Sequence, residues 1–293
     1  MNEAYRPRRS VLYMPGANER ALEKAKGLPA DGLILDLEDA VAPDAKADAR
    51  DRIAAAIAGG EYGRRELIGR VNGLDTDWFA ADVRTVAAAG PDAVLVPKVG
   101  SVEDVRTIEA AVEAAGAPDH TRIWAMLETP SAILHAAEIA SCSERLTGFV
   151  MGANDLVKEL RAVRVPGRAP LLPAMSWALL AVRDAGKVIL DGVYNDLDDA
   201  DGFEAECRQG REMGFDGKTL IHPRQLAPCN RIYAPSEVEI DEAREVIDAW
   251  DAAQAAGQGG VVTVNGRMIE NLHVEEARRA VAQAEAIAAL EAG

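Results

Sequence analysis

Glu128 and Asp155 are the two residues of this sequence that best suit metal chemistry, because each follows an apolar run and the two runs are consecutive along the chain. If the runs are neighbouring parallel strands, their carboxyl ends meet at one edge and the two carboxylates can approach one another. Two carboxylates without a cluster of histidines or cysteines favour Mg²⁺, and the four histidines here are scattered, which argues against zinc. The pattern predicts a Mg²⁺ site able to polarise a carbonyl and stabilise an enolate.

Other polar residues follow apolar runs in the same way, and Arg70 is the most informative of them. Its planar fork can hold a carboxylate or a developing oxyanion. The remaining members of this set are Asp36, Glu38, Asp39, Asn72, Lys98, Asn154, Asp191, Asn195, Lys218 and His222. Any one of them is more often part of a structural ion pair than a catalytic group. If all of them converge on one rim, a bound ligand or ion is needed to satisfy them together.

Eight short apolar runs must position these side chains. They begin at Ser10, Gly32, Glu66, Ala93, Arg122, Leu146, Val188 and Phe215. Their length, β-branching and Gly/Pro flanks are typical of buried parallel strands, and amphipathic segments lie between them, one with a capped start at Ser101 and Asp104. The chain has no G-x-G-x-x-G turn. Eight βα repeats at this length predict an α/β protein whose residues 1–230 form a (β/α)8 TIM barrel.

Residues 231–293 form a separate, C-terminal pattern. A helix rich in acidic residues is followed by a β-hairpin with Asn265-Gly266 as its turn, and then by a helix from about Val274 to Leu290. This helix–hairpin–helix appendage is too small to fold alone. We therefore expect it to pack on a barrel, either its own or that of a neighbouring subunit.

Composition narrows the class of protein. The 293 residues are 48 % hydrophobic, which allows a sizeable core, and the formal net charge is −16, which disfavours nucleic-acid binding. An anionic substrate then needs a local basic pocket. Three cysteines show neither metal spacing nor a disulfide framework, and no apolar run has membrane length or marks a secretion signal. These features predict a cytoplasmic protein with reduced thiols that meets no membrane.

Seven blocks of the sequence resemble one family in order along essentially the whole chain: RRSVLYMPGANERALEKA, DGLILDLEDAV, GRVNGLDT, VPKV, AMLETP, MGANDL and GFDGKTLIHPRQL. This is the citrate lyase β-subunit-like group of the HpcH/HpaI aldolase superfamily, which includes malyl-CoA and β-methylmalyl-CoA lyases and (3S)-malyl-CoA thioesterases. The resemblance implies a barrel fold and homo-oligomers, trimers or hexamers. It also implies Mg²⁺-dependent action on short 3-hydroxyacyl-CoA thioesters.

The resemblance also implies residue roles at the rim. Glu128 and Asp155 would be the metal ligands, and Arg70 would be a catalytic residue that contacts the substrate carbonyl or carboxylate. Asp36 and Glu38 would belong to the polar network that binds the substrate around them.

A basic N-terminal segment is a further candidate. The resemblance implies that Arg9, Arg20 and Lys24 bind the phosphates of CoA. The alternative is that these residues belong to a solvated helix face.

The segment Met268-Ile269-Glu270 after the hairpin turn carries the last candidate. In the resembling lyases the matching residues read Met-Ile-Asp, and the aspartate is the acid/base group supplied to a neighbouring subunit's active site. Here Glu270 keeps the acid and adds one methylene, about an ångström of reach, enough to change a rate about a hundredfold. The alternative is an acid that stabilises the start of a helix through the macrodipole.

The Glu-Asn-Leu-His form resembles the thioesterase branch and favours hydrolysis of malyl-CoA to malate and CoA. Three alternatives stay open. One is cleavage of malyl-CoA or β-methylmalyl-CoA to glyoxylate and an acyl-CoA. Another is the β-subunit of a citrate lyase, acting on an acyl-carrier thioester with partner subunits. The third is a CoA-binding module without activity, against which Glu128, Asp155 and Arg70 argue.

Overall fold

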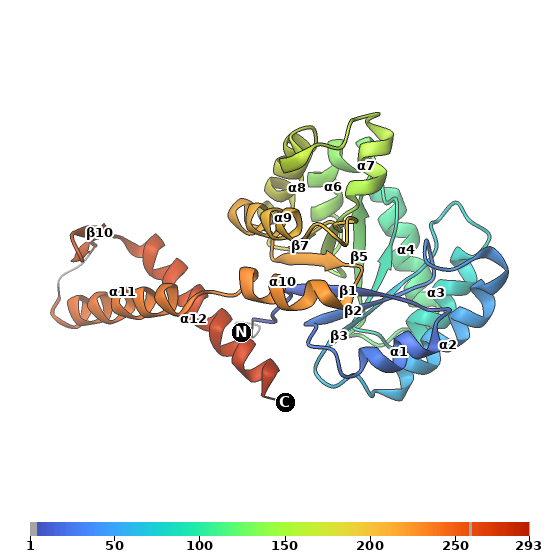
Figure 1. The fold of residues 1–293 in the computed structure, drawn as a ribbon, viewed down its shortest axis with the longest axis horizontal. Coiled ribbons are helices and arrows are strands. Elements are labelled where there is room, and N and C mark those ends of the chain that lie inside the picture. Colours follow the sequence, from blue (N-terminus) through green and yellow to red (C-terminus); the bar gives the residue numbers. More distant parts are fainter. Residues whose placement is uncertain (1–4, 258–259, 293) are drawn as a thin grey trace. The chain divides into compact units, whose positions relative to one another are not determined.

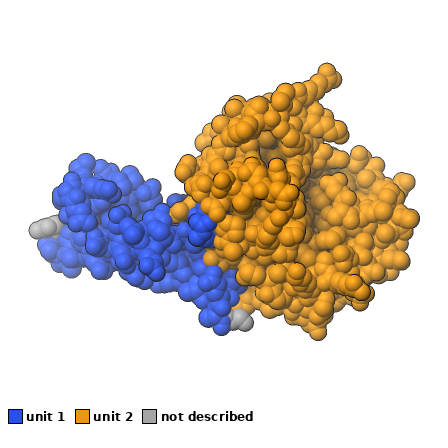
Figure 2. Space-filling view, viewed as in Figure 1, with its two compact units in different colours: residues 1–7, 231–293 blue, residues 8–230 orange. Residues whose placement is uncertain are grey.

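A computed structural model describes residues 5–257 and 260–292. The chain divides into two compact units, one of residues 8–230 and one of residues 1–7 with 231–293 (Figure 2). The larger unit carries every apolar run that the sequence analysis assigned to a strand.

The larger unit is a closed barrel of eight parallel strands in sequence order, so the predicted α/β barrel is confirmed (Figure 1). The strands are β1 (Ser10–Pro15), β2 (Gly32–Asp36), β3 (Glu66–Arg70), β4 (Ala93–Val96), β5 (Arg122–Leu127), β6 (Leu146–Met151), β7 (Val188–Asp191) and β8 (Gly217–Leu220). Strand β8 pairs with β1 and closes the ring, with Val11 opposite Thr219. Closure leaves no sheet edge and brings all eight carboxyl ends to one face.

Helices connect the strands and surround the barrel (Figure 1). They are α1 (Glu19–Ala25), α2 (Lys46–Gly59), α3 (Phe79–Ala88), α4 (Val102–Ala114), α5 (Pro130–Leu134), α6 (Ala136–Ser141), α7 (Ala153–Glu159), α8 (Leu172–Asp184), α9 (Ala200–Met213) and α10 (Leu226–Tyr233). Short 3-10 turns are η1 (Pro43–Ala45), η2 (Pro166–Arg168) and η3 (Pro223–Gln225). The predicted cap at Ser101 is confirmed, since its hydroxyl accepts a hydrogen bond from the Asp104 N–H.

The barrel interior is packed with branched aliphatic side chains and one large aromatic ring. Val11, Ile34 and Leu95 are fully buried in one cluster with Trp124. The indole fits because Gly148 on β6 has no side chain: a Cβ there would overlap the Trp124 ring. Trp124 is thus a large ring in a cluster of otherwise mostly aliphatic buried side chains.

The smaller unit has the predicted helix–hairpin–helix pattern. Helix α11 (Glu237–Ala255) is followed by strands β9 (Val262–Val264) and β10 (Arg267–Ile269) and by helix α12 (Asn271–Glu291). Asn265 and Gly266 both have positive φ, 49° and 76°, as a two-residue hairpin turn of type I′ requires. Trp250, Ile269 and Val274 form a small core of their own. No helix within 5–257 and 260–292 is long and apolar enough to cross a membrane.

Candidate active site

The carboxyl ends of the strands surround a cavity of about 290 Å³, which we call the central cavity. Four of the predicted site residues line it: Asp36, Arg70, Glu128 and Asp155. They come from β2, β3, the end of β5 and the first turn of α7, so the closed barrel brings together residues up to 119 positions apart in the chain (155 − 36). This is the face on which barrels build catalytic sites.

Glu128 is held by its neighbours on both sides. Its Oε1 accepts a hydrogen bond of 2.8 Å from the backbone N–H of Lys98, a residue in the left-handed region at φ 56°. Opposite it, Gly152 leaves room that a Cβ would take, because that atom would overlap the Glu128 carboxyl. The side chain is 2 % exposed, and burial together with the charge of Asp155 raises the pKa of Glu128 to about 7.

This pair of carboxylates fits Mg²⁺. Oxygen donors suit a hard cation, and a cation between Glu128 and Asp155 would relieve the repulsion that raises the pKa of Glu128. No group of three or more His, Cys, Asp or Glu side chains able to hold a metal exists in the described part of the chain. A cation at these two carboxylates would need further ligands from water or substrate oxygens, which is common for Mg²⁺.

Arg70 lies in the central cavity with its fork already occupied. Its Nε and Nη2 donate to the two Asp36 oxygens at 2.6 and 2.7 Å, and its Nη1 pairs with Glu38 at 2.8 Å. Burial alone would lower the pKa of Arg70, but Asp36 and the other surrounding negative charge hold it well above the ordinary value. Burial raises the pKa of Glu38 to about 7 against the opposing effect of Arg70. Arg70 and Glu38 therefore form a linked pair at the cavity wall.

Tyr13 on β1 is a cavity residue that the sequence analysis missed. It lines the central cavity, and the Arg70 guanidinium lies 4.7 Å from its ring centroid. Burial raises the pKa of Tyr13 far above its ordinary value, so its hydroxyl stays protonated and can donate. A polar aromatic residue inside the apolar run SVLYMP was the signal for it.

Comparison with known proteins identifies the family. The HpcH/HpaI aldolase/citrate lyase model matches residues 9–223, which include the whole barrel except the end of its last connection. The chain belongs to this family.

Curated members of the family match the chain almost from end to end. A (3S)-malyl-CoA thioesterase of Cereibacter sphaeroides is 51 % identical over 97 % of this chain and 96 % of its own length. The citrate lyase subunit beta of Escherichia coli is 40 % identical over 96 % and 94 %. An L-malyl-CoA/beta-methylmalyl-CoA lyase of Cereibacter sphaeroides is 36 % identical over 97 % and 96 %. These relatives are enzymes that act on CoA esters or belong to citrate lyase, so this chain is an enzyme of the same family.

A solved structure of the family matches both units. CitE of Mycobacterium tuberculosis, crystallised with magnesium, acetoacetate and coenzyme A, is 28 % identical and covers 94 % of this chain and 97 % of its own, with a TM-score of 0.77. The barrel of this family member therefore provides an independent example of the fold described above.

Arg9 lies at the opposite end of β1 from the central cavity. It precedes the strand, is 3 % exposed, and its Nη2 pairs with Asp31 Oδ1 at 2.8 Å. Arg9 therefore forms a buried ion pair in the structure, where its guanidinium binds Asp31 and is shielded from solvent. In the part of the chain that the structure describes, no contact supports its expected role in binding CoA phosphates. Arg20 and Lys24 are exposed on α1 and do not line the central cavity.

Glu270 lies in the smaller unit as the residue before α12. Its backbone N–H donates to Nδ1 of His273 at 3.0 Å, which forms one half of a capping arrangement. The flanking side chains Met268 and Leu272 are 63 % and 51 % exposed. The other half of this capping box is the Glu270 side chain, which faces the His273 N–H, so the carboxyl lies at the start of α12 and its catalytic role stays a prediction.

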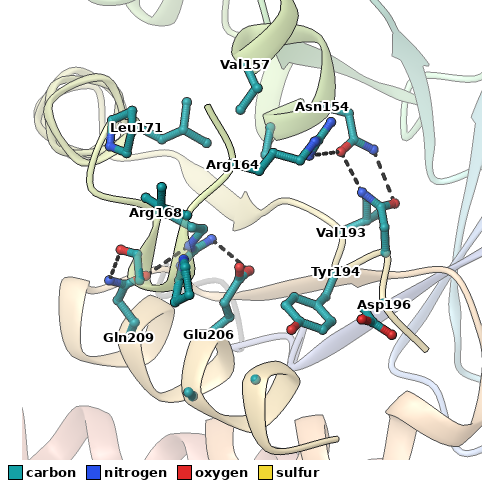
Figure 3. Close-up of a pocket in the computed structure, with 18 of the residues that line it drawn as sticks. Asn154, Val157, Arg164, Arg168, Leu171, Val193, Tyr194, Asp196, Glu206 and Gln209 are labelled. Carbon is teal, nitrogen blue, oxygen red and sulfur yellow. Dashed lines mark hydrogen bonds and ion pairs between the residues drawn. The ribbon is translucent and has the colours of Figure 1, made fainter. Parts of the chain in front are cut away.

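A second, larger cavity of about 440 Å³ adjoins the central one (Figure 3). We call it the side cavity; it lies between α7, the connection 160–171 and α9. Four residues line both cavities: Ala153, Asn154, Val193 and Asn195. Asn154 and Asn195 were expected at the rim of the barrel, but no pattern in the sequence predicts the side cavity.

Proposed function

We propose that the protein is a Mg²⁺-dependent (3S)-malyl-CoA thioesterase, which hydrolyses malyl-CoA to malate and CoA. The observation that carries the proposal is the pair Glu128 and Asp155 beside Arg70 in one cavity at the carboxyl face of the barrel. The 51 % identity to a named (3S)-malyl-CoA thioesterase over nearly the full length of both chains supports the choice of substrate and reaction.

In this proposal each residue has a defined task. Glu128 and Asp155 would hold Mg²⁺, which when bound would polarise a substrate carbonyl. Arg70 contacts the carboxylate or carbonyl of the acyl group through Nη1, which it shares with Glu38, while Asp36 holds Nε and Nη2. The Tyr13 ring packs against the guanidinium, with its centroid 4.7 Å away. The wall formed by Asp36, Glu38 and Arg70 thus orients the acyl group against the metal.

Glu270 acts as the general base. Its carboxylate takes a proton from water, the water oxygen attacks the thioester carbon, and the C–S bond breaks. The CoA thiolate then takes up that proton. We further propose that residues 231–293 pack on a neighbouring subunit of a homotrimer or hexamer in the cytoplasm and bring Glu270 to that subunit's cavity, while Arg20 and Lys24 contact CoA phosphates. Light scattering on the purified chain measures the oligomer.

The competing reaction is C–C cleavage to glyoxylate and acetyl-CoA, or cleavage of a citryl thioester. The 36 % identity to a malyl-CoA/β-methylmalyl-CoA lyase and the 40 % identity to a citrate lyase subunit keep these in view. The longer acid at position 270 favours hydrolysis, because Glu270 reaches about an ångström further than the aspartate of the resembling lyases.

Product analysis tests the proposal directly. Purified protein, malyl-CoA and Mg²⁺ are expected to yield malate and free CoA in equal amounts. Glyoxylate with acetyl-CoA as the main products would assign the protein to the lyases instead. The absence of any product from malyl-CoA, with turnover of a citryl thioester, would assign it to the citrate lyase β-subunits.

Arg70→Lys is expected to lower kcat/KM by about 2 kcal/mol, roughly thirtyfold, because lysine keeps the charge but loses the fork that grips Asp36 and presents Nη1. Initial rates across malyl-CoA concentrations measure this. Arg50→Lys is the matched control. Arg50 pairs with Asp82 at 2.6 Å, and neither residue lines the central cavity. Rates for Arg70→Lys within about twofold of the parent would leave Arg70 a purely structural ion pair.

A further inference from the structure

The side cavity is walled mainly by aliphatic side chains, among them Val157, Val165, Leu171 and Val193. Figure 3 shows Val157 and Leu171 on the upper side of the space and Val193 on its right, with Arg168, Glu206 and Gln209 on the lower side. Nearby, Val163 is 72 % exposed, so apolar surface faces the opening as well. A concave, mostly apolar space of about 440 Å³ has the size and character of a ligand pocket.

The floor of the side cavity carries charges that are paired with one another. Arg168 pairs with Asp191 at 2.7 Å and Glu206 at 3.4 Å, and Lys218 pairs with the same two acids at 2.9 and 3.3 Å. This set of two cations and two acids is neutral, and only Arg168 and Glu206 of it line the cavity. Arg164, Asp196 and Asp199 are further charged lining residues, so an uncharged group is expected on the aliphatic wall alone.

Arg168 also fixes the wall that faces the floor. It adopts φ 56°, a conformation rare for arginine, and its Nε donates to Gln209 Oε1 at 2.9 Å while Gln209 donates to Gly167 O at 2.8 Å. Such a backbone persists only where its surroundings hold it. The connection 160–171 is therefore anchored to α9 and to the barrel, so the cavity is preformed.

The wall shared with the central cavity has a polar half and an apolar half. In the polar half, Asn154 Oδ1 accepts from Asn195 at 2.7 Å and from Arg164 at 2.8 Å, which closes that side (Figure 3). In the apolar half, Ala153 and Val193 line both cavities. Ala153 and Val193 therefore form the apolar part of the wall at which the two cavities adjoin.

We propose that the side cavity binds an alkyl substituent on the hydroxyl-bearing carbon of the acyl group. The ligand class is a 3-carboxy-3-hydroxyacyl-CoA thioester with an unbranched 3-alkyl chain of about three to six carbons. The inference rests on the proposed function, with the substrate hydroxyl taken as one of the oxygens that a metal at Glu128 and Asp155 would bind. Ala153, Asn154 and Asp155 lie in the first turn of α7 and all line the central cavity, so a carbon whose hydroxyl is held at Asp155 would face the shared wall.

The test compares kcat/KM for the 3-butyl thioester with that for malyl-CoA itself. Each buried methylene is worth about fourfold in binding, so the parent is expected to process the butyl substrate at least as efficiently as malyl-CoA. Ala205, an exposed residue of α9, lines only the side cavity. Ala205→Trp is expected to lower the butyl-to-malyl ratio at least about tenfold by filling the space.

Ala55→Trp is the matched control, because Ala55 is an exposed helical alanine of α2 that lines neither cavity. Its butyl-to-malyl ratio should equal that of the parent. A parent that turns over malyl-CoA but rejects the butyl thioester, or an unchanged ratio in Ala205→Trp, would overturn the inference. If malyl-CoA itself is not turned over, the proposed function fails separately. In that case calorimetry with Mg²⁺ present gives the dissociation constants of the butyl thioester and of malyl-CoA, and their ratio is compared between the proteins. An equal ratio for the parent and Ala205→Trp would contradict binding of the alkyl chain in the side cavity.

Discussion

Asp155→Ala is expected to abolish Mg²⁺ binding in the accessible concentration range and to lower kcat/KM at least about a thousandfold. Glu128 and Asp155 are the two acids proposed as ligands, since Asp36 in the same cavity is paired with Arg70, so removing one leaves a single proposed carboxylate ligand for a divalent cation. Calorimetric titration with Mg²⁺ measures binding without turnover, and rates with and without EDTA measure the catalytic requirement. Asp184→Ala, an exposed acid of α8, controls for the loss of one negative charge.

The pKa of Glu128 adds a pH dependence to this prediction. Mg²⁺ needs the carboxylate, and this carboxyl protonates below about pH 7, so Mg²⁺ affinity should fall as pH drops below 7. In the metal-free protein the pH dependence of the free energy of unfolding has the opposite sign to that of Mg²⁺ affinity. The folded pKa lies above the ordinary value of 4.5, so the stabilising contribution of the neutral acid is full below that value and is lost as pH rises through 7.

The rise in Tm on adding Mg²⁺ should therefore be larger near about pH 8 than near about pH 5.5. Glu128→Gln should remove this difference. Glu38, whose pKa also lies near 7, provides the control, because Glu38→Gln should keep it. Full activity after EDTA treatment, or an Asp155→Ala protein that binds Mg²⁺ normally, would refute the metal assignment.

Glu270→Ala is expected to lower the rate of CoA release about a hundredfold or more, because it removes the group proposed to take the proton from the attacking water. Glu270→Asp shortens the acid by one methylene. We expect it also to lose hydrolysis, and any glyoxylate that it forms from malyl-CoA would show that acid length decides between hydrolysis and C–C cleavage. Assays for free CoA, malate and glyoxylate separate these outcomes.

The capping role of Glu270 gives a distinct result. An acid that only stabilises the start of α12 is worth about 0.3–1 kcal/mol, so its loss would lower Tm slightly and leave turnover unchanged. Glu276→Ala removes another exposed acid of α12 and controls for charge. Normal turnover by Glu270→Ala would end the catalytic assignment of this segment. The Glu270 side chain is part of the capping box, so Tm is measured beside the rate: a large loss of rate at an unchanged Tm comes from the chemistry and not from unfolding of the helix start.

Local chemistry in the sequence was enough to predict most elements of the fold. The Ser101 cap, the Asn265-Gly266 hairpin turn and the eight apolar runs each depend on residues within a few positions of one another. The start of the last helix is the exception in detail: α12 begins at Asn271 rather than near Val274, because the cap at Glu270 adds most of a turn ahead of the apolar residues. The order of the eight βα repeats along the chain was then enough to predict a closed barrel, because their number and right-handed connections favour closure of the sheet.

The sequence also determined which acids meet. Glu128 and Asp155 follow consecutive strands, and neighbouring parallel strands necessarily end side by side. The ion-pair partner of each charged group could not be predicted from the sequence, because the two partners lie far apart in the chain. Asp31 binds Arg9, and Asp36 binds Nε and Nη2 of Arg70; the spacing of the residues in the sequence marks neither pair.

The side cavity was decided by tertiary structure alone. It exists because Arg168, in a rare backbone conformation, meets Asp191 and Glu206 across 23 and 38 positions and holds the connection 160–171 away from Val193. No periodic pattern encodes an empty space, since a cavity is the volume left where packed elements fail to touch. Its position beside Asp155, and thus its bearing on which acyl groups this enzyme accepts, follows only from how the loop is anchored on the closed barrel.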